Sequence, residues 1–162
     1  MTLLKKRFPT PTGDMTLVAH ARALVGLVWD EGELPRLGLA AAEPGANAPL
    51  DDGERQLQEY FAGKRTRFDL PLDPAGSEFQ RSVWDRLKEI PFGSTWSYRE
   101  LALRVGNPGA ARAVGSANGR NPLCILIPCH RVVKASGDLG GYAGGAERKA
   151  FLIGLEGSAA RT

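Results

Sequence analysis

The sequence predicts a mixed α/β (α+β) fold in two domains, residues 1–76 and 77–162. In the first part, short apolar runs alternate with turn residues, which is typical of strands. In the second part, helix-start signals are followed by apolar residues at helical spacing. A chain of 162 residues is long enough for one or two small domains with a buried core.

Two strands are expected near the N-terminus, at residues 15–20 (MTLVAH) and 24–30 (LVGLVWD). A link of three residues joins them, so they are expected to lie side by side. Residues 36–49 contain one more short strand, followed by a loop rich in proline, glycine and alanine. These segments predict a small sheet.

One helix completes the first domain. Asp51 or Asp52 can cap its start, and the helix is expected to run to Phe61, with Gly63 as the stop residue. Residues 65–73 (RTRFDLPLD) form a poor central strand and a good linker to the second domain, because prolines interrupt them. The helix side chains expected to face inward are Leu57, Tyr60 and Phe61.

The second domain is expected to begin with a helix. Ser77, followed three residues later by Gln80, matches a capping box, in which each side chain bonds to the other residue's backbone. Residues 91–93 (PFG) end this helix. The apolar stripe along it consists of Phe79, Val83, Trp84, Leu87 and Ile90.

Two further short helices are expected after it. Ser97 and Glu100 match a second capping box, and residues 106–108 (GNP) form a tight break. The helix that follows, residues 109–119, consists of small residues with one long side chain, Arg112. Two short helices joined by a tight turn suit a helix-turn-helix. The alternative is an alanine-rich helix packed inside an ordinary core.

The chain closes with a loop and a helix. Residues 140–145 (GGYAGG) are expected to form a flexible loop that carries one aromatic side chain. Residues 146–157 are expected to form the final helix, which ends at Gly157.

Charge is unevenly distributed along the chain. Residues 1–76 hold 9 Lys/Arg and 11 Asp/Glu, a net charge of −2. Residues 77–162 hold 12 Lys/Arg and 7 Asp/Glu, a net charge of +5. A basic half can attract phosphate backbones, or it can simply be a solvated surface.

The sequence favours a cytoplasmic location. The N-terminus does not match a signal peptide, and no apolar run approaches the roughly 20 residues of a membrane span. The only cysteines are Cys124 and Cys129, which make a poor disulfide framework and should remain thiols in a reducing compartment.

The segment ILIPCHRVV carries the candidate chemistry, because it places Cys129 beside His130. If residues 123–127 (LCILI) form a strand that continued through Pro128, the two side chains would point to opposite faces. Pro128 makes continuation unfavourable, since it has no N–H for the ladder. A turn there lets neighbouring residues act on one pocket, directly or through a water.

A free thiol is a weak nucleophile at neutral pH, with a pKa of about 8.5, and a nearby histidine can take its proton. A third group should orient that histidine, and Glu156 or Asp138 is the candidate acid. An isolated Cys-His pair is more often structural, with the cysteine packed as a small hydrophobe. The spacing of two Cys and two His predicts no metal site.

The second domain resembles the O6-alkylguanine-DNA alkyltransferases, also called methylated-DNA–protein-cysteine methyltransferases. The resemblance rests on IPCHRVV, on GSANGRNP before it, on SGDLGGYAGGAERKAFLIGLEG after it, and on FQRSVWDRLKEIPFGSTWSYRELALRVGNPGAARAVG upstream. It covers essentially all of residues 77–157. Residues 1–76 are only loosely similar, and the family implies a ribonuclease-H-like sheet-plus-helix domain there. For the second domain it implies a winged-helix or helix-turn-helix-like fold.

The resemblance implies a role for five residues in catalysis. Cys129 would accept an alkyl group irreversibly, so that each molecule acts once. His130 would be the base through a bound water, with Glu156 orienting its ring. Tyr98 would donate a proton or hydrogen bond to the departing guanine, and Asn121 would be a hinge that braces the recognition helix against the active-site strand.

It also implies that the partner is double-stranded DNA carrying alkylated guanine. Arg112 would enter the base stack in place of a flipped nucleotide, and the helix 109–119 would lie in the minor groove, where small residues allow close approach. The remaining expected DNA contacts on and beside this helix are Ala110, Ala111, Ala113, Ser116, Gly119 and Arg120. The expected walls of the base pocket are Ser136, Tyr142 and Ala143.

Several further expectations follow. No zinc is expected, because residues 1–76 contain no cysteine and only His20, and no other cofactor is expected. We expect a monomer that binds DNA either singly or cooperatively, and alkylated thymine is a second possible substrate. The alternative functions are a lesion-binding or regulatory DNA-binding module without alkyl transfer, and a cysteine hydrolase.

Overall fold

The computed structural model describes residues 2–160, and these divide into two compact units with the boundary between Ala75 and Gly76. Within the described residues, no helix has the length and apolar character needed to cross a membrane.

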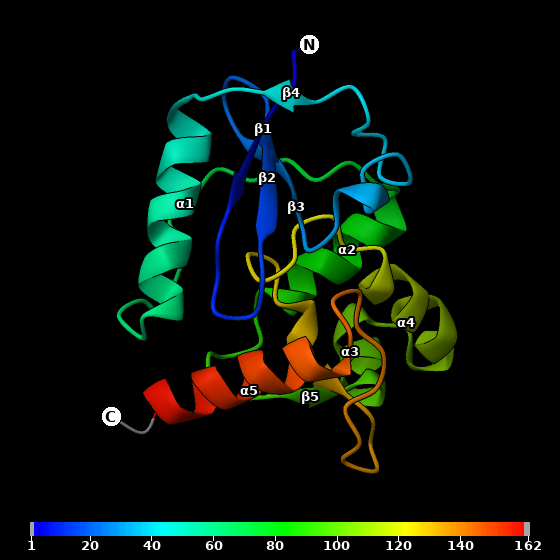
Figure 1. The fold of residues 1–162 in the computed structure, drawn as a ribbon. Helices are drawn as coiled ribbons and strands as arrows, with labels where there is room; N and C mark the ends of the chain where they lie inside the picture. The colour runs from blue at the N-terminus through cyan, green and yellow to red at the C-terminus, as the bar shows by residue number, and fades with distance from the viewer. Residues whose placement is uncertain (1, 161–162) are drawn as a thin grey trace. The chain divides into compact units, whose positions relative to one another are not determined.

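The first unit is a small sheet with one long helix (Figure 1). The strand order is β3-β2-β1-β4, in which β1 and β2, and β2 and β3, pair antiparallel, while the short β4 pairs parallel to β1. Its elements are β1 (Leu4–Phe8), β2 (Met15–Ala19), β3 (Leu24–Val28), a 3-10 turn η1 (Glu31–Glu33), β4 (Glu43–Pro44) and α1 (Ala48–Phe61).

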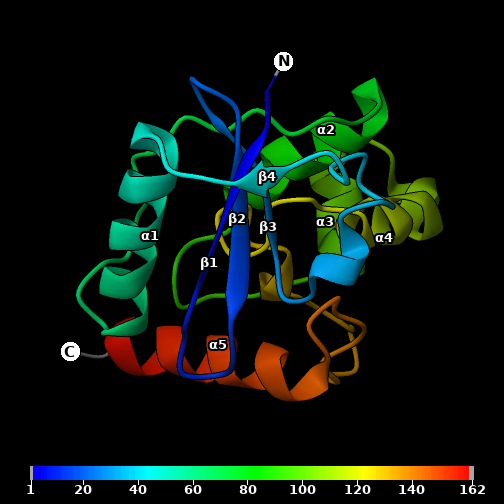
Figure 2. The ribbon, with the colours of Figure 1, turned by 45° about the horizontal axis from the view of Figure 1, so that its top comes forward.

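The three strand segments expected from the sequence are confirmed, and β1 is an additional strand. β2 and β3 are buried along their whole length, as their apolar sequences require. The sequence of β1 is LKKRF. It was not predicted, because the strands were predicted from apolar runs and three of its five residues are charged. Figure 2 shows α1 running beside the strands of this unit.

The start of α1 differs from the expectation. Asn47, rather than Asp51 or Asp52, is the cap, and its Oδ1 accepts a hydrogen bond from the N–H of Leu50 at 3.0 Å. The helix begins earlier because Pro49 is tolerated in a first helical turn, where its missing N–H costs no hydrogen bond. The expected inward residues Leu57, Tyr60 and Phe61 are all buried.

The second unit is mostly helical. Its elements are α2 (Glu78–Leu87), β5 (Trp96–Ser97), α3 (Tyr98–Val105), a 3-10 turn η2 (Pro108–Ala110), α4 (Ala111–Gly119), a 3-10 turn η3 (Cys129–Arg131), β6 (Val132–Val133) and α5 (Ala146–Ala160). The helices α2, α3 and α4 contact one another. Trp84 of α2 donates a buried hydrogen bond from Nε1 to the carbonyl of Ala117 at 2.8 Å, which fixes α2 against α4.

Both predicted helix starts in this unit are confirmed. Ser77 and Gln80 form the full capping box, whereas the second box has only one of its two bonds, in which the Ser97 hydroxyl accepts from the N–H of Glu100 at 3.0 Å. Gly106 ends α3 in a left-handed conformation with φ of 90°, which a glycine adopts without strain. The short break before η2 and α4 therefore has the form of a helix-turn-helix.

Two expectations for the helices of this unit were wrong. Phe79 is 37% exposed, because the packing surface of α2 begins one turn later, at Val83. The final helix does not end at Gly157 but continues to Ala160. A glycine ends a helix when its backbone turns left-handed, and Gly157 does not have the positive φ that this requires.

Candidate active site

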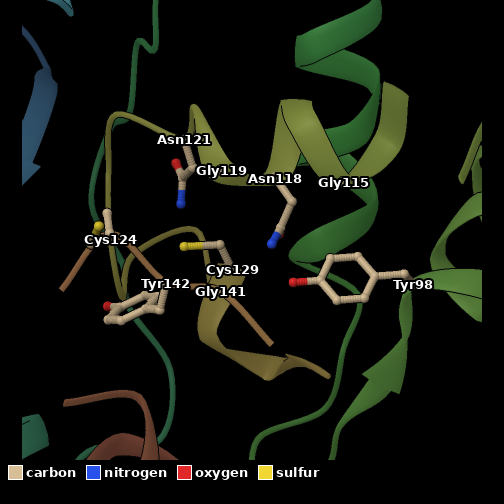
Figure 3. Close-up of a pocket in the computed structure, with 10 residues that line it drawn as sticks. Tyr98, Gly115, Asn118, Gly119, Asn121, Cys124, Cys129, Gly141 and Tyr142 are labelled. Carbon is tan, nitrogen blue, oxygen red and sulfur yellow. The ribbon is translucent and has the colours of Figure 1, made fainter. Parts of the chain in front are cut away.

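A cavity of about 270 Å³ in the second unit brings together residues from four segments of the chain (Figure 3). Among them are the thiols of Cys124 and Cys129, the phenol of Tyr98 and two asparagine side chains. The residues that line it are Tyr98, Gly115, Asn118, Gly119, Asn121, Cys124, Cys129, Gly141, Tyr142 and Ala143.

Residues 123–127 do not form the expected strand. They form a turn, with hydrogen bonds from Leu126 N to Cys124 O at 2.8 Å and from Ile127 N to Leu123 O at 2.9 Å. Ile125 has a φ of 71°, which is strained for a β-branched residue. These two hydrogen bonds close the turn within the segment.

Asn121 holds this turn closed. Its amide nitrogen donates to the carbonyl of Ile127 at 2.7 Å, and its Oδ1 accepts from the N–H of Leu123 at 3.0 Å. Asn121 is buried and lies two residues after α4. It therefore braces α4 against a turn, and not against the strand expected from the sequence.

After the turn, Pro128 leads into the 3-10 turn η3, in which Cys129, His130 and Arg131 are all buried. Cys129 faces the cavity (Figure 3), whereas His130 is fully buried. The next residues form β6, and Val132 pairs in parallel with Trp96 of β5. Because Tyr98 follows β5 directly, this pairing brings Tyr98 to the cavity that Cys129 lines.

The surroundings of Cys129 favour its thiolate. A hydrogen bond with the Cys124 side chain is the largest influence that lowers the pKa of the Cys129 thiol below its ordinary value. Burial opposes this, but a hydrogen bond with Asn121 and the positive charge of Lys149 reinforce it. A thiol with a lowered pKa is more often ionised at neutral pH, and the thiolate is the nucleophilic form.

Glu156 is the acid that contacts His130. His130 Nε2 donates to Glu156 Oε2 at 2.6 Å, and Arg131 Nε donates to Glu156 Oε1 at 2.7 Å. Arg131 also donates from Nη1 to the carbonyl of Ile90 at 2.9 Å. Asp138, the other candidate, instead accepts a hydrogen bond from the Ser136 hydroxyl on an exposed turn.

This arrangement keeps Glu156 charged and His130 neutral. Burial raises the pKa of Glu156, but the hydrogen bonds from His130 and Arg131 and the positive charge of Arg131 outweigh it and lower that pKa to about 2. Burial is also the largest influence on His130, and it lowers the imidazole pKa. With Nε2 donating to Glu156, Nδ1 is the proton acceptor, and it is a buried atom without a hydrogen-bond partner in the described structure.

Tyr98 lies across the cavity from Cys129, at the start of α3. Its side chain packs close to Gly115 and Gly140, where an added Cβ would lie 3.7 Å and 3.1 Å from the ring and hydroxyl. Burial is the largest influence that raises the pKa of the phenol, with a further contribution from Cys129, while a hydrogen bond with Asn118 opposes both. Figure 3 shows the Asn118 amide nitrogen facing the Tyr98 hydroxyl, so the phenolic proton stays available to a ligand.

The helix α4 has one buried and one exposed face. Val114, Ala117 and Asn118 are buried. The exposed face carries only small side chains and two arginines, and Ala110 precedes it at the end of η2. The exposed residues are Ala111, Arg112, Ala113, Ser116, Gly119 and Arg120.

The loop before α5 supplies a further wall of the cavity. Tyr142 and Ala143, both expected there from the sequence, line it together with Gly141. Ser136 lies outside the lining on an exposed turn, which is closed by hydrogen bonds from Lys134 N to Asp138 O and from Gly137 N to Lys134 O, each at 2.9 Å.

Three polar residues of this site were not singled out from the sequence: Asn118, Arg131 and Lys149. Lys149 is buried, and its ammonium donates to the carbonyls of Val132 at 2.6 Å, Gly141 at 3.2 Å and Leu139. Burial lowers its pKa to about 8. A signal was present, because Lys149 precedes Glu156 by seven residues, or two helical turns, and the two therefore share a face.

Comparison with known proteins identifies similar sequences along both units. The family model "6-O-methylguanine DNA methyltransferase, ribonuclease-like domain" matches residues 3–74. The model "6-O-methylguanine DNA methyltransferase, DNA binding domain" matches residues 78–158. The methylated-DNA–protein-cysteine methyltransferase of Mycobacterium tuberculosis is 47% identical over 152 residues, which span 93% of this chain and 90% of that protein.

Solved structures give the same result. The crystal structure of Mycobacterium tuberculosis O6-methylguanine methyltransferase aligns with a TM-score of 0.87 at 45% identity, covering 98% of this chain and 94% of that one. The structure of Mycobacterium tuberculosis OGT in complex with DNA aligns with a TM-score of 0.87 at 43% identity, covering 96% and 93%. The mixed fold expected from the sequence, with a small sheet domain and a helical domain, is therefore confirmed.

Proposed function

The chain belongs to the 6-O-methylguanine DNA methyltransferase family and repairs DNA by alkyl transfer, and we propose that the sulfur of Cys129 is the acceptor. The observation that carries this assignment is the position of Cys129. Its thiol lines the cavity, its pKa is lowered, and the adjacent His130 is held by Glu156. Residues 1–76 form the ribonuclease-like domain and residues 77–162 the domain that binds DNA and accepts the alkyl group.

The first step is ionisation of the acceptor thiol. His130 is neutral and has Nδ1 as its acceptor, so it can take the Cys129 proton through a bridging water. Glu156 then stabilises the imidazolium that forms, at 2.6 Å from Nε2. The hydrogen bonds of Cys124 and Asn121 and the charge of Lys149 stabilise the thiolate.

The second step is displacement at the alkyl carbon. The Cys129 thiolate attacks that carbon, the new S–C bond forms, and the bond between carbon and O6 of guanine breaks. The electron pair leaves with guanine, and Tyr98 donates a proton or hydrogen bond to it from across the cavity. The product is a thioether, which has no good leaving group, so each molecule acts once.

DNA is the partner, and α4 is the element proposed to enter it. The lesion atom lies inside the duplex, so the nucleotide must leave the stack to reach Cys129. Arg112 is exposed on α4 and can occupy the space that the nucleotide leaves. The small exposed side chains around it permit close approach to the minor groove, where readout is largely independent of sequence.

The finer assignments follow from the same chemistry. Alkylated guanine in double-stranded DNA is the proposed substrate, with O4-alkylated thymine as a further one. Arg120 and the net charge of +5 in residues 77–162 support sequence-independent contact with phosphates. We propose that the chain acts as a monomer, alone or cooperatively on DNA, in the cytoplasm, where its thiols stay reduced.

Lesion binding without alkyl transfer is not favoured. The relatives are named as methyltransferases, and this chain has a cysteine with a lowered pKa at the cavity. A binding module does not need an ionised sulfur beside a histidine held by a carboxylate.

A count of transferred groups tests the proposal. The protein is incubated with an excess of duplex oligonucleotide carrying O6-methylguanine, and the protein mass is measured. We expect one methyl group per molecule, located on Cys129, and none on Cys129→Ser. More than one group per molecule, or undiminished transfer to Cys129→Ser, would refute the assignment. The variant Cys124→Ser is the matched control and should still accept one group.

A further inference from the structure

The cavity contains two thiols, although the proposed reaction uses only one. Cys124 and Cys129 both line it, and a hydrogen bond joins their side chains. Figure 3 shows the sulfur of Cys129 on the side of that residue that faces Cys124. They are the only cysteines of the chain, and they are not joined in a disulfide.

The backbone between the two cysteines accounts for their approach. A strand would carry Cys124 and Cys129 well apart, since each residue advances the chain by about 3.3 Å. The turn instead folds back on itself, closed by the hydrogen bond from Ile127 N to Leu123 O at 2.9 Å, with Ile125 at a φ of 71°. Asn121 reinforces it through the carbonyl of Ile127 at 2.7 Å.

The two thiols differ in reactivity. Cys129 has a lowered pKa and therefore reacts with oxidants as a thiolate. Cys124 donates to it and lies in the position of a resolving thiol, the neighbour that captures an oxidised sulfur before further oxidation. Both side chains are nearly inaccessible from the surface, at 5% and 3% exposure, so only a small oxidant that enters the cavity reaches them.

We propose that Cys124 and Cys129 form a modification site, at which hydrogen peroxide oxidises Cys129 and Cys124 then closes a reversible intramolecular disulfide. In the first step the Cys129 thiolate attacks one peroxide oxygen, an S–O bond forms, the O–O bond breaks and hydroxide leaves. In the second step the Cys124 sulfur attacks the sulfenic sulfur of Cys129, the S–S bond forms and the S–O bond breaks. The hydroxide released takes up the Cys124 proton, so peroxide is reduced to two waters and the dithiol is oxidised.

This disulfide would protect a sulfur that the protein can use only once. Without a resolving thiol, sulfenic acid proceeds to sulfinic acid, which thiol reductants do not reverse. With Cys124 in place, a reductant restores both thiols. The disulfide would block alkyl transfer while it lasts, so repair would stop under oxidation and resume afterwards.

The experiment uses the full chain without DNA. Wild type, Cys124→Ser and Cys129→Ser are treated with hydrogen peroxide, free thiols are capped with iodoacetamide, and intact masses are measured before and after dithiothreitol. Serine keeps the hydrogen-bond donor of Cys124 but cannot form an S–S bond, which makes Cys124→Ser the matched variant. Circular dichroism establishes that each variant is folded, and Cys124→Ala replaces Cys124→Ser if the serine disturbs the turn.

Wild type is expected to lose the mass of two hydrogen atoms, to resist capping and to regain both thiols with dithiothreitol. Cys124→Ser is expected to gain oxygen atoms irreversibly, and Cys129→Ser to remain unoxidised at the same dose. The proposal is overturned if wild type gains oxygen as Cys124→Ser does, if it forms reducible dimers instead, or if Cys129→Ser oxidises as fast as wild type. These masses do not depend on alkyl transfer. A failure of the disulfide proposal therefore leaves the proposed alkyl transfer standing, and a failure of alkyl transfer leaves the disulfide proposal standing.

Discussion

His130 Nε2 lies 2.6 Å from Oε2 of Glu156, and both side chains are buried, at 0% and 2% exposure. The same carboxylate is 2.7 Å from Arg131 Nε, so one acid holds both an imidazole and a guanidinium. Removing one member of such a buried pair leaves a buried charge without a partner, which lowers the free energy of unfolding. Glu156 therefore supports the fold as well as the orientation of His130.

This double role predicts a pH dependence of stability. The folded-state pKa of Glu156 is lowered from 4.5 to about 2, so its contribution is complete above about pH 4.5 and is lost as the pH falls towards about 2. A shift of this size corresponds to about 3 kcal/mol in the free energy of unfolding. Urea unfolding at a series of acidic pH values should show this loss in wild type and not in Glu156→Gln. Equal slopes in the two proteins would contradict it.

Lys149 should set the ionisation of Cys129. Its charge favours the thiolate, so Lys149→Met should raise the Cys129 pKa. The measurement is the pH midpoint of iodoacetamide alkylation of Cys129, which does not depend on DNA. Lys134→Met is the control, because Lys134 is exposed in the same unit and should leave the midpoint unchanged. An unshifted midpoint in Lys149→Met would show that the charge does not act on the thiol.

Tyr98 and Asn118 should act together. Tyr98→Phe removes the proposed proton donor and should slow alkyl transfer on the order of 10²-fold, with little change in DNA affinity. Asn118→Leu removes the partner of the hydroxyl and should slow transfer less. In a double-mutant cycle the combined variant should be no slower than Tyr98→Phe alone. Additive losses would mean that Asn118 acts independently of the phenol.

Arg112 should matter only when a nucleotide has to leave a duplex. We expect Arg112→Ala to slow repair of O6-methylguanine in duplex DNA more than transfer from the free methylated base. Single-turnover rates of wild type and Arg112→Ala on each substrate give the loss of rate on duplex DNA and on the free base, and the two losses are compared. Arg104→Ala is the matched control, because Arg104 is exposed and engages Trp96 of β5 and Glu100 of α3. An equal loss on both substrates would exclude a role in flipping.

The sequence was informative where a local interaction decides the structure. Ser77 and Ser97 mark helix starts because their hydroxyls accept a hydrogen bond from the backbone three residues later. Such pairs lie close in the sequence and can be recognised from it alone. Gly106 marks a helix end for a similar reason. Pro128 correctly indicated that the chain turns before Cys129.

The sequence was less informative where distant residues decide. Residues 123–127 are apolar throughout, and such a run has the same composition in a buried strand and in a buried turn. The turn is selected by the side chain of Asn121 and tolerates Ile125 at a positive φ. The burial of Arg131 and Lys149 depends on carbonyls and a carboxylate that other segments of the chain supply. In the sequence alone, an arginine and a lysine are expected to place their charged groups in solvent.

The pairing of β5 with β6 spans only two residues on each side, but it has a mechanical consequence. Ser97 belongs to β5 and also caps α3, so the phenol of Tyr98 is anchored to the segment that carries the reactive sulfur without an intervening hinge. The proposed proton donor and the proposed acceptor sulfur are thus held on paired segments before any ligand arrives. If these groups keep their positions on binding, the movement that brings the lesion to the sulfur has to come from the flipped nucleotide.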